Sequence, residues 1–109
     1  MINNLIINTL KPLGIPVGFQ KYSGSQDTYI TFFCYNERGR VFADDEEIRT
    51  GFSVQVDIWS KGNYIEIVRR TRKLLEDVGF KRTSAADLYE SDTGIYHKGM
   101  RFSYEKEVI

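Results

Sequence analysis

The sequence lacks several features that identify common protein classes: cysteine and histidine are scarce, no charge sign is in excess, and no long apolar run is present. It contains one cysteine, Cys34, and one histidine, His97, among 109 residues. A single cysteine excludes a framework of intramolecular disulfides and is typical of a reducing, intracellular setting. A thiol–imidazole catalytic pair would need both residues. Cys34 lies in an apolar strand pattern, where a free cysteine usually packs as a small hydrophobic residue, and the sequence shows nothing that orients His97, so we expect no such pair.

An excess of charge of one sign and long apolar runs are also lacking. Fifteen basic and 15 acidic side chains give a formal net charge of zero, which disfavours a protein that coats nucleic acid or a membrane surface. No apolar run approaches the roughly 20 residues that span a bilayer. The N-terminus has no basic segment followed by a long apolar one, so we expect no signal peptide. The length predicts a single domain over residues 1–109.

The strongest pattern is a strand followed by a helix between Gly51 and Phe80. Alternating apolar residues predict a half-buried strand: Phe52, Val54, Val56 and Ile58. Three- and four-residue spacing then predicts an amphipathic helix: Tyr64, Ile67, Val68, Thr71, Leu74, Leu75 and Val78. Asn63 and Glu66 have the spacing of a capping box, and Gly79 and Phe80 suit the helix C-terminus.

The remaining elements are shorter or less regular. We expect a helix over residues 2–13, strands over 17–22, 29–37, 87–90 and 95–105, a long connection over 38–50 and a polar segment over 81–86. The predicted core places Val54, Val56, Ile58, Met100 and Phe102 against Leu5, Leu74, Leu75 and Val78. Together these elements predict an α+β fold with two layers, a mostly antiparallel β-sheet packed against two α-helices.

The predicted strand at residues 29–37 is apolar on both faces. Ile30, Phe32 and Cys34 form one face, and the other face is formed by Tyr29, Phe33 and Tyr35. Such a strand is either enclosed within its own domain or presents one face to another chain. Trp59 also allows two interpretations. It projects from the polar face of its strand, and it is either covered by a neighbouring element or serves as an interface anchor.

The connection over residues 38–50 combines basic and acidic residues. Arg38, Arg40 and Phe42 come first, and Asp44, Asp45, Glu46 and Glu47 follow. The acidic run lacks the alternate-residue spacing and the glycine of a calcium loop. A solvated loop, or a loop that pairs with basic residues of another subunit, is favoured over a metal site. A small metal-dependent hydrolase or nuclease remains the enzymatic alternative.

Four basic residues on the predicted second helix raise the question of nucleic-acid binding: Arg69, Arg70, Arg72 and Lys73. Carboxylates four residues away partly neutralise them, through the pairs Glu66–Arg70, Arg72–Glu76 and Lys73–Asp77. A solvated helix face with ion pairs is therefore expected, without sequence-specific recognition of nucleic acid.

Several runs resemble the tail completion proteins of siphophage-type bacteriophages, also called head–tail joining proteins. They are VQVDIWSKGNY (residues 54–64), GFKRTSAADLYESDTGIYHKGMRFSY (79–104), ITFFCYNE (30–37) and FADDEEI (42–48). Residues 1–29 match only in outline. The chain is also similar to tail terminators, which share the architecture.

The resemblance implies an α+β subunit of a ring, usually hexameric, at the junction between the head connector or stopper and the tail tube. It implies a non-enzymatic virion protein of the neck or tail, present in the host cytoplasm during assembly, with no catalytic residues, cofactor, metal or membrane. Capping of the tail tube as a terminator is the alternative. We take as candidate interface residues Tyr29, Phe33, Tyr35, Arg38, Arg40, Phe42, Asp44, Asp45, Glu46, Glu47 and Trp59.

Overall fold

The computed structural model describes residues 2–43, 46–91 and 93–107, with the side chains of residues 40–48, 90 and 107 left aside. Its elements in chain order are α1 (Ile2–Leu10), the 3₁₀ turn η1 (Lys11–Leu13), β1 (Val17–Phe19), β2 (Tyr29–Ala43), β3 (Glu46–Ser60), α2 (Ile65–Asp77), β4 (Lys81–Glu90) and β5 (Ile95–Glu107). In the described part, no helix is long and apolar enough to cross a membrane.

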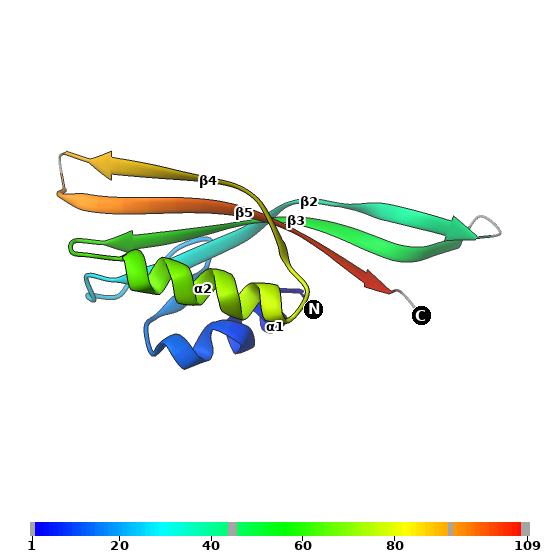
Figure 1. The fold of residues 1–109 in the computed structure, drawn as a ribbon, viewed down its shortest axis with the longest axis horizontal. Helices are drawn as coiled ribbons and strands as arrows, with labels where there is room; N and C mark the ends of the chain where they lie inside the picture. The colour runs from blue at the N-terminus through cyan, green and yellow to red at the C-terminus, as the bar shows by residue number, and fades with distance from the viewer. Residues whose placement is uncertain (1, 44–45, 92, 108–109) are drawn as a thin grey trace.

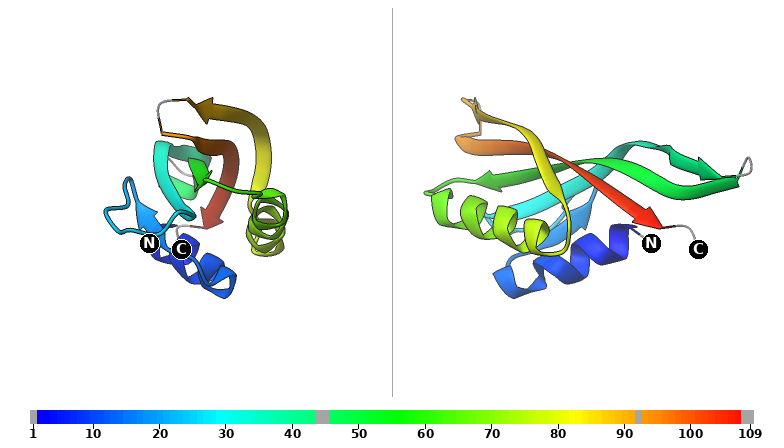
Figure 2. Two further views of the ribbon diagram at one scale, coloured as in Figure 1. Left: turned by 90° about the vertical axis from the view of Figure 1, so that its left-hand side faces the viewer. Right: turned by 45° about the vertical axis from the view of Figure 1, so that its right-hand side comes forward.

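The five strands form one sheet in the order β1-β2-β3-β5-β4. β1 pairs with β2 in parallel, and the pairs β2–β3, β3–β5 and β5–β4 are antiparallel. Both helices lie on the same side of the sheet (Figure 1), and the end-on view of Figure 2 shows how strongly the sheet twists above them. The predicted two-layer α+β fold is confirmed.

The core lies between the helices and one face of the sheet. Its most deeply buried side chains are Ile6, Leu10, Ile30, Phe32, Val54, Val56, Ile58, Leu75, Met100 and Phe102. Six of the residues predicted for the core are among them: the five on strands and Leu75. Leu5 and Leu74, which were also predicted, are partly buried against this core. Val78 was wrongly predicted, because it is the C-cap of α2 and 42% exposed, and Phe80 takes the buried place beyond the helix end.

Of the two predictions for the ends of α2, the one for the C-terminus is confirmed and the one for the N-terminus is wrong. At the C-terminus Gly79 has φ +106°, its N–H donates to the Glu76 carbonyl, and the Phe80 N–H donates to the Leu75 carbonyl, which is the hydrogen-bond pattern of a Schellman motif. At the N-terminus the capping-box prediction is wrong. The Asn63 side chain accepts from the Ile65 N–H, but Glu66 binds Arg69 instead.

The segment predicted as a long connection, residues 38–50, is instead the distal half of a hairpin. Strand β2 continues to Ala43 and β3 begins at Glu46, while Asp44 and Asp45 lie outside the described residues. The sequence pattern did not predict these strands, because the β2–β3 register shifts at three places: between residues 34 and 36, 39 and 41, and 41 and 42. Each irregularity interrupts the two-residue alternation by which a strand is recognised. The hairpin extends one end of a molecule that measures 53 × 25 × 24 Å (Figure 1).

Three other strand boundaries also differ from the prediction. β4 spans Lys81–Glu90 rather than residues 87–90, β1 ends at Phe19, and β5 continues to Glu107. β4 is exposed along residues 81–89, so neither of its faces has to be apolar. Its first half is therefore polar and basic, as is common at a sheet edge.

Replacing Leu75 tests the core. Its side chain has no exposed surface, so we expect Leu75→Ala to lower the free energy of unfolding by about 2–5 kcal/mol. Leu88→Ala is the control, because Leu88 is 54% exposed and should change that free energy by less than about 0.5 kcal/mol. Urea unfolding followed by circular dichroism measures both, and equal small losses would contradict the core assignment.

Candidate interaction surface on the open face of the sheet

The sheet face turned away from the helices carries the polar and aromatic half of each alternating strand. In β3 the core residues Val54, Val56 and Ile58 alternate with Gln55, Asp57 and Trp59, which therefore lie on the open face. The register places Tyr29 of β2 and His97 of β5 on either side of Trp59. Gly99 and Arg101 continue the row along β5, opposite Asp57 and Gln55.

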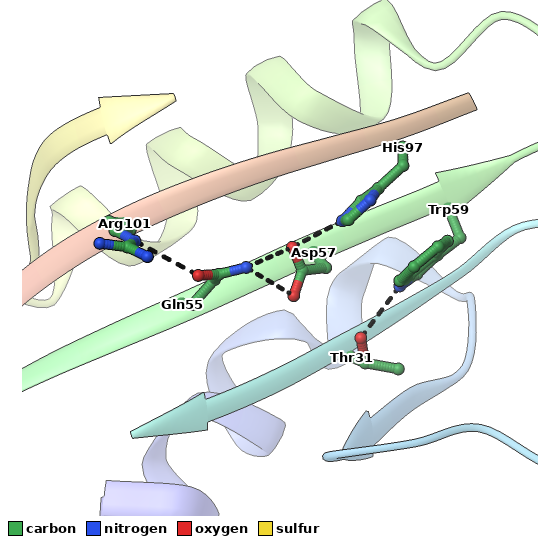
Figure 3. A network of polar contacts seen from close by, with 6 residues as sticks. All are labelled: Thr31, Gln55, Asp57, Trp59, His97 and Arg101. Carbon is green, nitrogen blue, oxygen red and sulfur yellow. Dashed lines mark hydrogen bonds and ion pairs between the residues drawn. The ribbon is translucent and has the colours of Figure 1, made fainter. Parts of the chain in front are cut away.

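Asp57 is the centre of a hydrogen-bond network on this face (Figure 3). The residue is 5% exposed, and its Oδ1 lies 2.6 Å from His97 Nε2 and accepts from Gln55 Nε2 at 2.9 Å. A buried carboxylate needs such partners, because desolvation without them is costly. The expectation that nothing orients the imidazole is wrong, since Asp57 holds the His97 ring.

Trp59 is partly buried by neighbours from the adjacent strands. Its Nε1 donates to Thr31 Oγ1 at 3.0 Å. The indole stacks on the His97 ring with centroids 3.8 Å apart and lies 6.1 Å from the Tyr29 ring. These contacts cover part of the indole and hold its orientation. Its use as an interface anchor remains a prediction.

A second branch of the network joins Arg101 to the aromatic residues of β2. Arg101 Nε donates to Gln55 Oε1 at 3.3 Å, and its guanidinium lies 4.8 Å from the centre of the Tyr35 ring. Phe33 contacts Tyr35 edge-on, with centroids 6.5 Å apart. Tyr35 is nevertheless 44% exposed. The aromatic face predicted for this strand is therefore present, with Tyr35 exposed and Tyr29 and Phe33 half-buried.

A shallow groove beside Asp57 could suggest chemistry, but its geometry does not assemble a catalytic triad. Its lining includes Ser84, His97 and Asp57. Ser84 pairs with Arg101, four positions along β5 from His97, a separation of roughly 13 Å at about 3.3 Å per residue. Cys34 belongs to the strand face that packs on the core, opposite His97. Among the described residues no group of three or more His, Cys, Asp or Glu side chains could hold a metal ion.

A cluster of tyrosines lies on the helix side, where the end of the β4–β5 hairpin meets the start of α2. Ring centroids are 4.8 Å apart for Tyr89–Tyr96 and 6.2 Å for Tyr64–Tyr96. The Tyr64 hydroxyl donates to Asp87 Oδ1 at 2.6 Å, and Lys98 also donates to Asp87. Burial, followed by this hydrogen bond, raises the pKa of Tyr64 to about 12. The same bond and Lys98 lower the pKa of Asp87.

The basic face of α2 is paired mainly as predicted. Arg72 and Lys73 bind Glu76 and Asp77 four residues later. The predicted Glu66–Arg70 pair is wrong, because Glu66 binds Arg69 and Arg70 donates to the Pro12 carbonyl. Ion pairs as exposed as these contribute little stability.

Comparison with known proteins reveals structural similarity to a solved chain but no match in sequence. No protein-family profile matches the sequence, and no curated protein matches it. Among solved structures, the chain is similar to a chain of the "Virion of native gene transfer agent (GTA) particle", with a TM-score of 0.65 over 94% of this chain and 91% of that chain. The two sequences are 9% identical. The comparison therefore establishes a shared fold over nearly the full length of both chains.

The structure brings together four of the predicted interface residues. Tyr29, Phe33, Tyr35 and Trp59 share the open face, and Arg38 lies farther along β2. The backbones of Arg40, Phe42, Glu46 and Glu47 belong to the β2–β3 hairpin, while Asp44 and Asp45 fall outside the described residues.

Sequence reasoning missed the polar network around Asp57. One signal was available, because Gly99 interrupts the last strand and a glycine within a strand often marks a close approach. A Cβ at Gly99 would lie 3.1 Å from Asp57 Oδ1. Recognising the partner required the β3–β5 register, which the sequence alone does not supply.

Replacing Asp57 tests whether the network stabilises the fold. Asp57→Ala leaves the Gln55 amide and the His97 ring without their acceptor, so we expect a loss of about 1–3 kcal/mol in unfolding free energy. Asp27→Ala is the control, since that carboxylate is 70% exposed and pairs with an exposed lysine. Urea unfolding measures both variants. If Asp57→Ala lowers the free energy of unfolding no more than the control does, the network does not stabilise the fold.

Proposed function

We propose that the protein is a non-enzymatic structural subunit of a virion head–tail junction, where it forms an oligomeric ring that joins the connector to the tail tube. The observation that carries this proposal is the fold likeness to a gene transfer agent virion chain over 94% of this chain and 91% of that chain. The resemblance of residues 30–37, 42–48, 54–64 and 79–104 to tail completion proteins supports the same assignment.

The surface of the subunit supports assembly more readily than catalysis. The sheet leaves one face without helices, and that face carries aromatic side chains. In the polar cluster around Asp57, the side chains of Gln55 and His97 are hydrogen-bonded to the Asp57 carboxylate. Repeated contacts between different surfaces of identical subunits generate a closed ring when the rotation between subunits closes.

Deletion of the gene from the phage or prophage that carries it tests the position in the virion. A joining subunit acts after head and tail are complete, so the deletion should yield filled heads and tails of normal length that remain separate. Electron microscopy of lysates detects this outcome. Adding the purified wild-type protein should restore joined particles.

Two other results would contradict the joining function. A tail terminator stops growth of the tail tube, so its loss should yield tails of uncontrolled length. A metal-dependent nuclease would cleave DNA in the presence of Mg²⁺ and lose that activity with a chelator, while joined particles would still form in its absence.

We further propose that the distal β2–β3 hairpin is an assembly element. Residues 36–50 carry both charges, with Arg38 and Arg40 before the acidic run that ends at Glu47. In a ring, each hairpin can meet opposite charge on the next subunit, and this contact repeats around the circle.

Shortening the hairpin tests this role. Deleting residues 40–47 and closing the strands with glycines should preserve folding, since the core formed by the described side chains lies between the helices and the sheet. Head–tail joining should slow by about tenfold or more, because the charged contact is lost. A control variant replaces residues 23–26 with glycines, which alters a loop without touching the hairpin. Joining is measured by adding each protein to separated heads and tails. A shortened protein that folds and joins at the wild-type rate would exclude the hairpin.

A further inference from the structure

Charge is unevenly distributed on the open face of the sheet, although the chain as a whole has no net charge. We take this face along residues 51–59 of β3 and the positions aligned with them on β2, β5 and β4, since residues paired across two strands lie on the same face. Along this described stretch, the exposed charged side chains are three basic and one acidic: Arg38, Lys81, Arg101 and Glu105. The other carboxylate, Asp57, is buried and bound to His97. The exposed charge of the face is therefore positive.

Aromatic rings lie beside these basic side chains. Tyr35 is 44% exposed, and Tyr29 and Phe33 are half-buried. The Arg101 guanidinium lies 4.8 Å from the centre of the Tyr35 ring. A guanidinium stacked in this way still presents N–H donors that bind phosphate. Rings for stacking and cations for phosphates are the two groups by which proteins bind single-stranded nucleic acid.

Small side chains leave a shallow depression along β5 on the same face. One recess of about 320 Å³ has Gly99 and Arg101 in its lining, and a second of about 130 Å³ has Arg38, Ser53 and Ser103. The strand from residue 99 to residue 105 spans about 20 Å, at about 3.4 Å per residue. Two recesses in sequence, each with an arginine in its lining, give a flexible charged strand a path over the sheet.

The polar side chains near the rings are bound to one another (Figure 3). Thr31 accepts from Trp59 Nε1, and the Asp57 carboxylate binds both Gln55 and His97. These contacts compete with any hydrogen bond to the edge of a base, so the face favours stacking and charge over readout of sequence. The 2′-hydroxyl, by which proteins distinguish RNA from DNA, gains no unbound partner in this network.

The same face offers little to an extended peptide. β3 lies between β2 and β5, and β5 lies between β3 and β4, so the backbone groups at the centre of the face are used within the sheet. Peptides that add to a sheet bind through such backbone groups at an edge. Recognition on this face therefore depends on its side chains.

We propose that the open face binds single-stranded DNA without sequence preference. A base stacks on Tyr35, and phosphates bind Arg38, Lys81 and Arg101. In a duplex the bases stack on one another and present no free ring face, so the single strand binds more tightly. This inference goes beyond the proposed function and does not depend on ring formation.

Fluorescence anisotropy of an end-labelled oligothymidine of about 20 nucleotides measures the binding, since such a strand exceeds the site of a single domain. If three cations bind phosphates, raising the salt concentration from about 50 mM to about 200 mM should weaken binding by about 20-fold. The intact protein is used throughout.

Two variants, each with a matched control, locate the site. Tyr35→Ala should weaken binding by about fivefold or more through lost stacking, while Tyr89→Ala should change it by less than about twofold. Tyr89 is 56% exposed but lies on the helix side, paired with Tyr96. Arg101→Gln should lower the slope of log affinity against log salt by about 0.7. Arg72→Gln, which alters α2, should leave that slope unchanged.

Five outcomes would overturn the proposal. They are no binding at about 100 µM protein and low salt, equal losses in Tyr35→Ala and Tyr89→Ala, tighter binding of a duplex of the same length, tighter binding of oligouridine, and equally effective competition by oligoglutamate. The duplex, oligouridine and oligoglutamate results would assign the face to duplex DNA, to RNA and to acidic peptides, respectively. Thermal unfolding verifies that each variant is folded, and Tyr35→Leu replaces Tyr35→Ala if that variant is not.

Discussion

The alternation of side chains along β3 is the constraint on which the rest of the structure depends. Val54, Val56 and Ile58 must face the helices, because these apolar side chains form the centre of the core. Asp57 and Trp59 are then fixed on the opposite face. A shift of one residue in register would exchange the two sets and place Asp57 in the core, where an unpaired carboxylate is strongly unfavourable. Core and open face are therefore specified together.

The open face shows how a strand accommodates a buried carboxylate without a covering layer. Asp57 is shielded by the side chains of its own sheet rather than by a helix, and His97 and Gln55 supply its hydrogen bonds. Gly99 leaves the necessary space, since a Cβ there would approach Asp57 Oδ1 to 3.1 Å. The network orders the rings on either side of it, so the aromatic surface is presented in one defined arrangement.

The sequence allowed prediction of those parts of the fold that follow from a regular period. The β3–α2 unit, the Gly79–Phe80 helix end and the apolar face of β5 all rest on uninterrupted local patterns. Prediction failed where the chain departs from a period. Bulges concealed the distal strands of the β2–β3 hairpin, and β4 needs no apolar face because it is an exposed edge. The Asp57–His97 contact joins residues 40 positions apart, and no local pattern encodes such a pairing.

The molecule is more extended than a compact domain of the same length. The radius of gyration is 15.1 Å, whereas a compact domain of this length has about 13 Å. The difference reflects strands that extend beyond the helix layer (Figure 1). Of the described side chains in the β2–β3 extension, those of residues 36–38 and 49 are exposed. Long exposed edges are a liability in an isolated protein, because they can pair with any available strand. Pairing with one specified partner strand removes that liability.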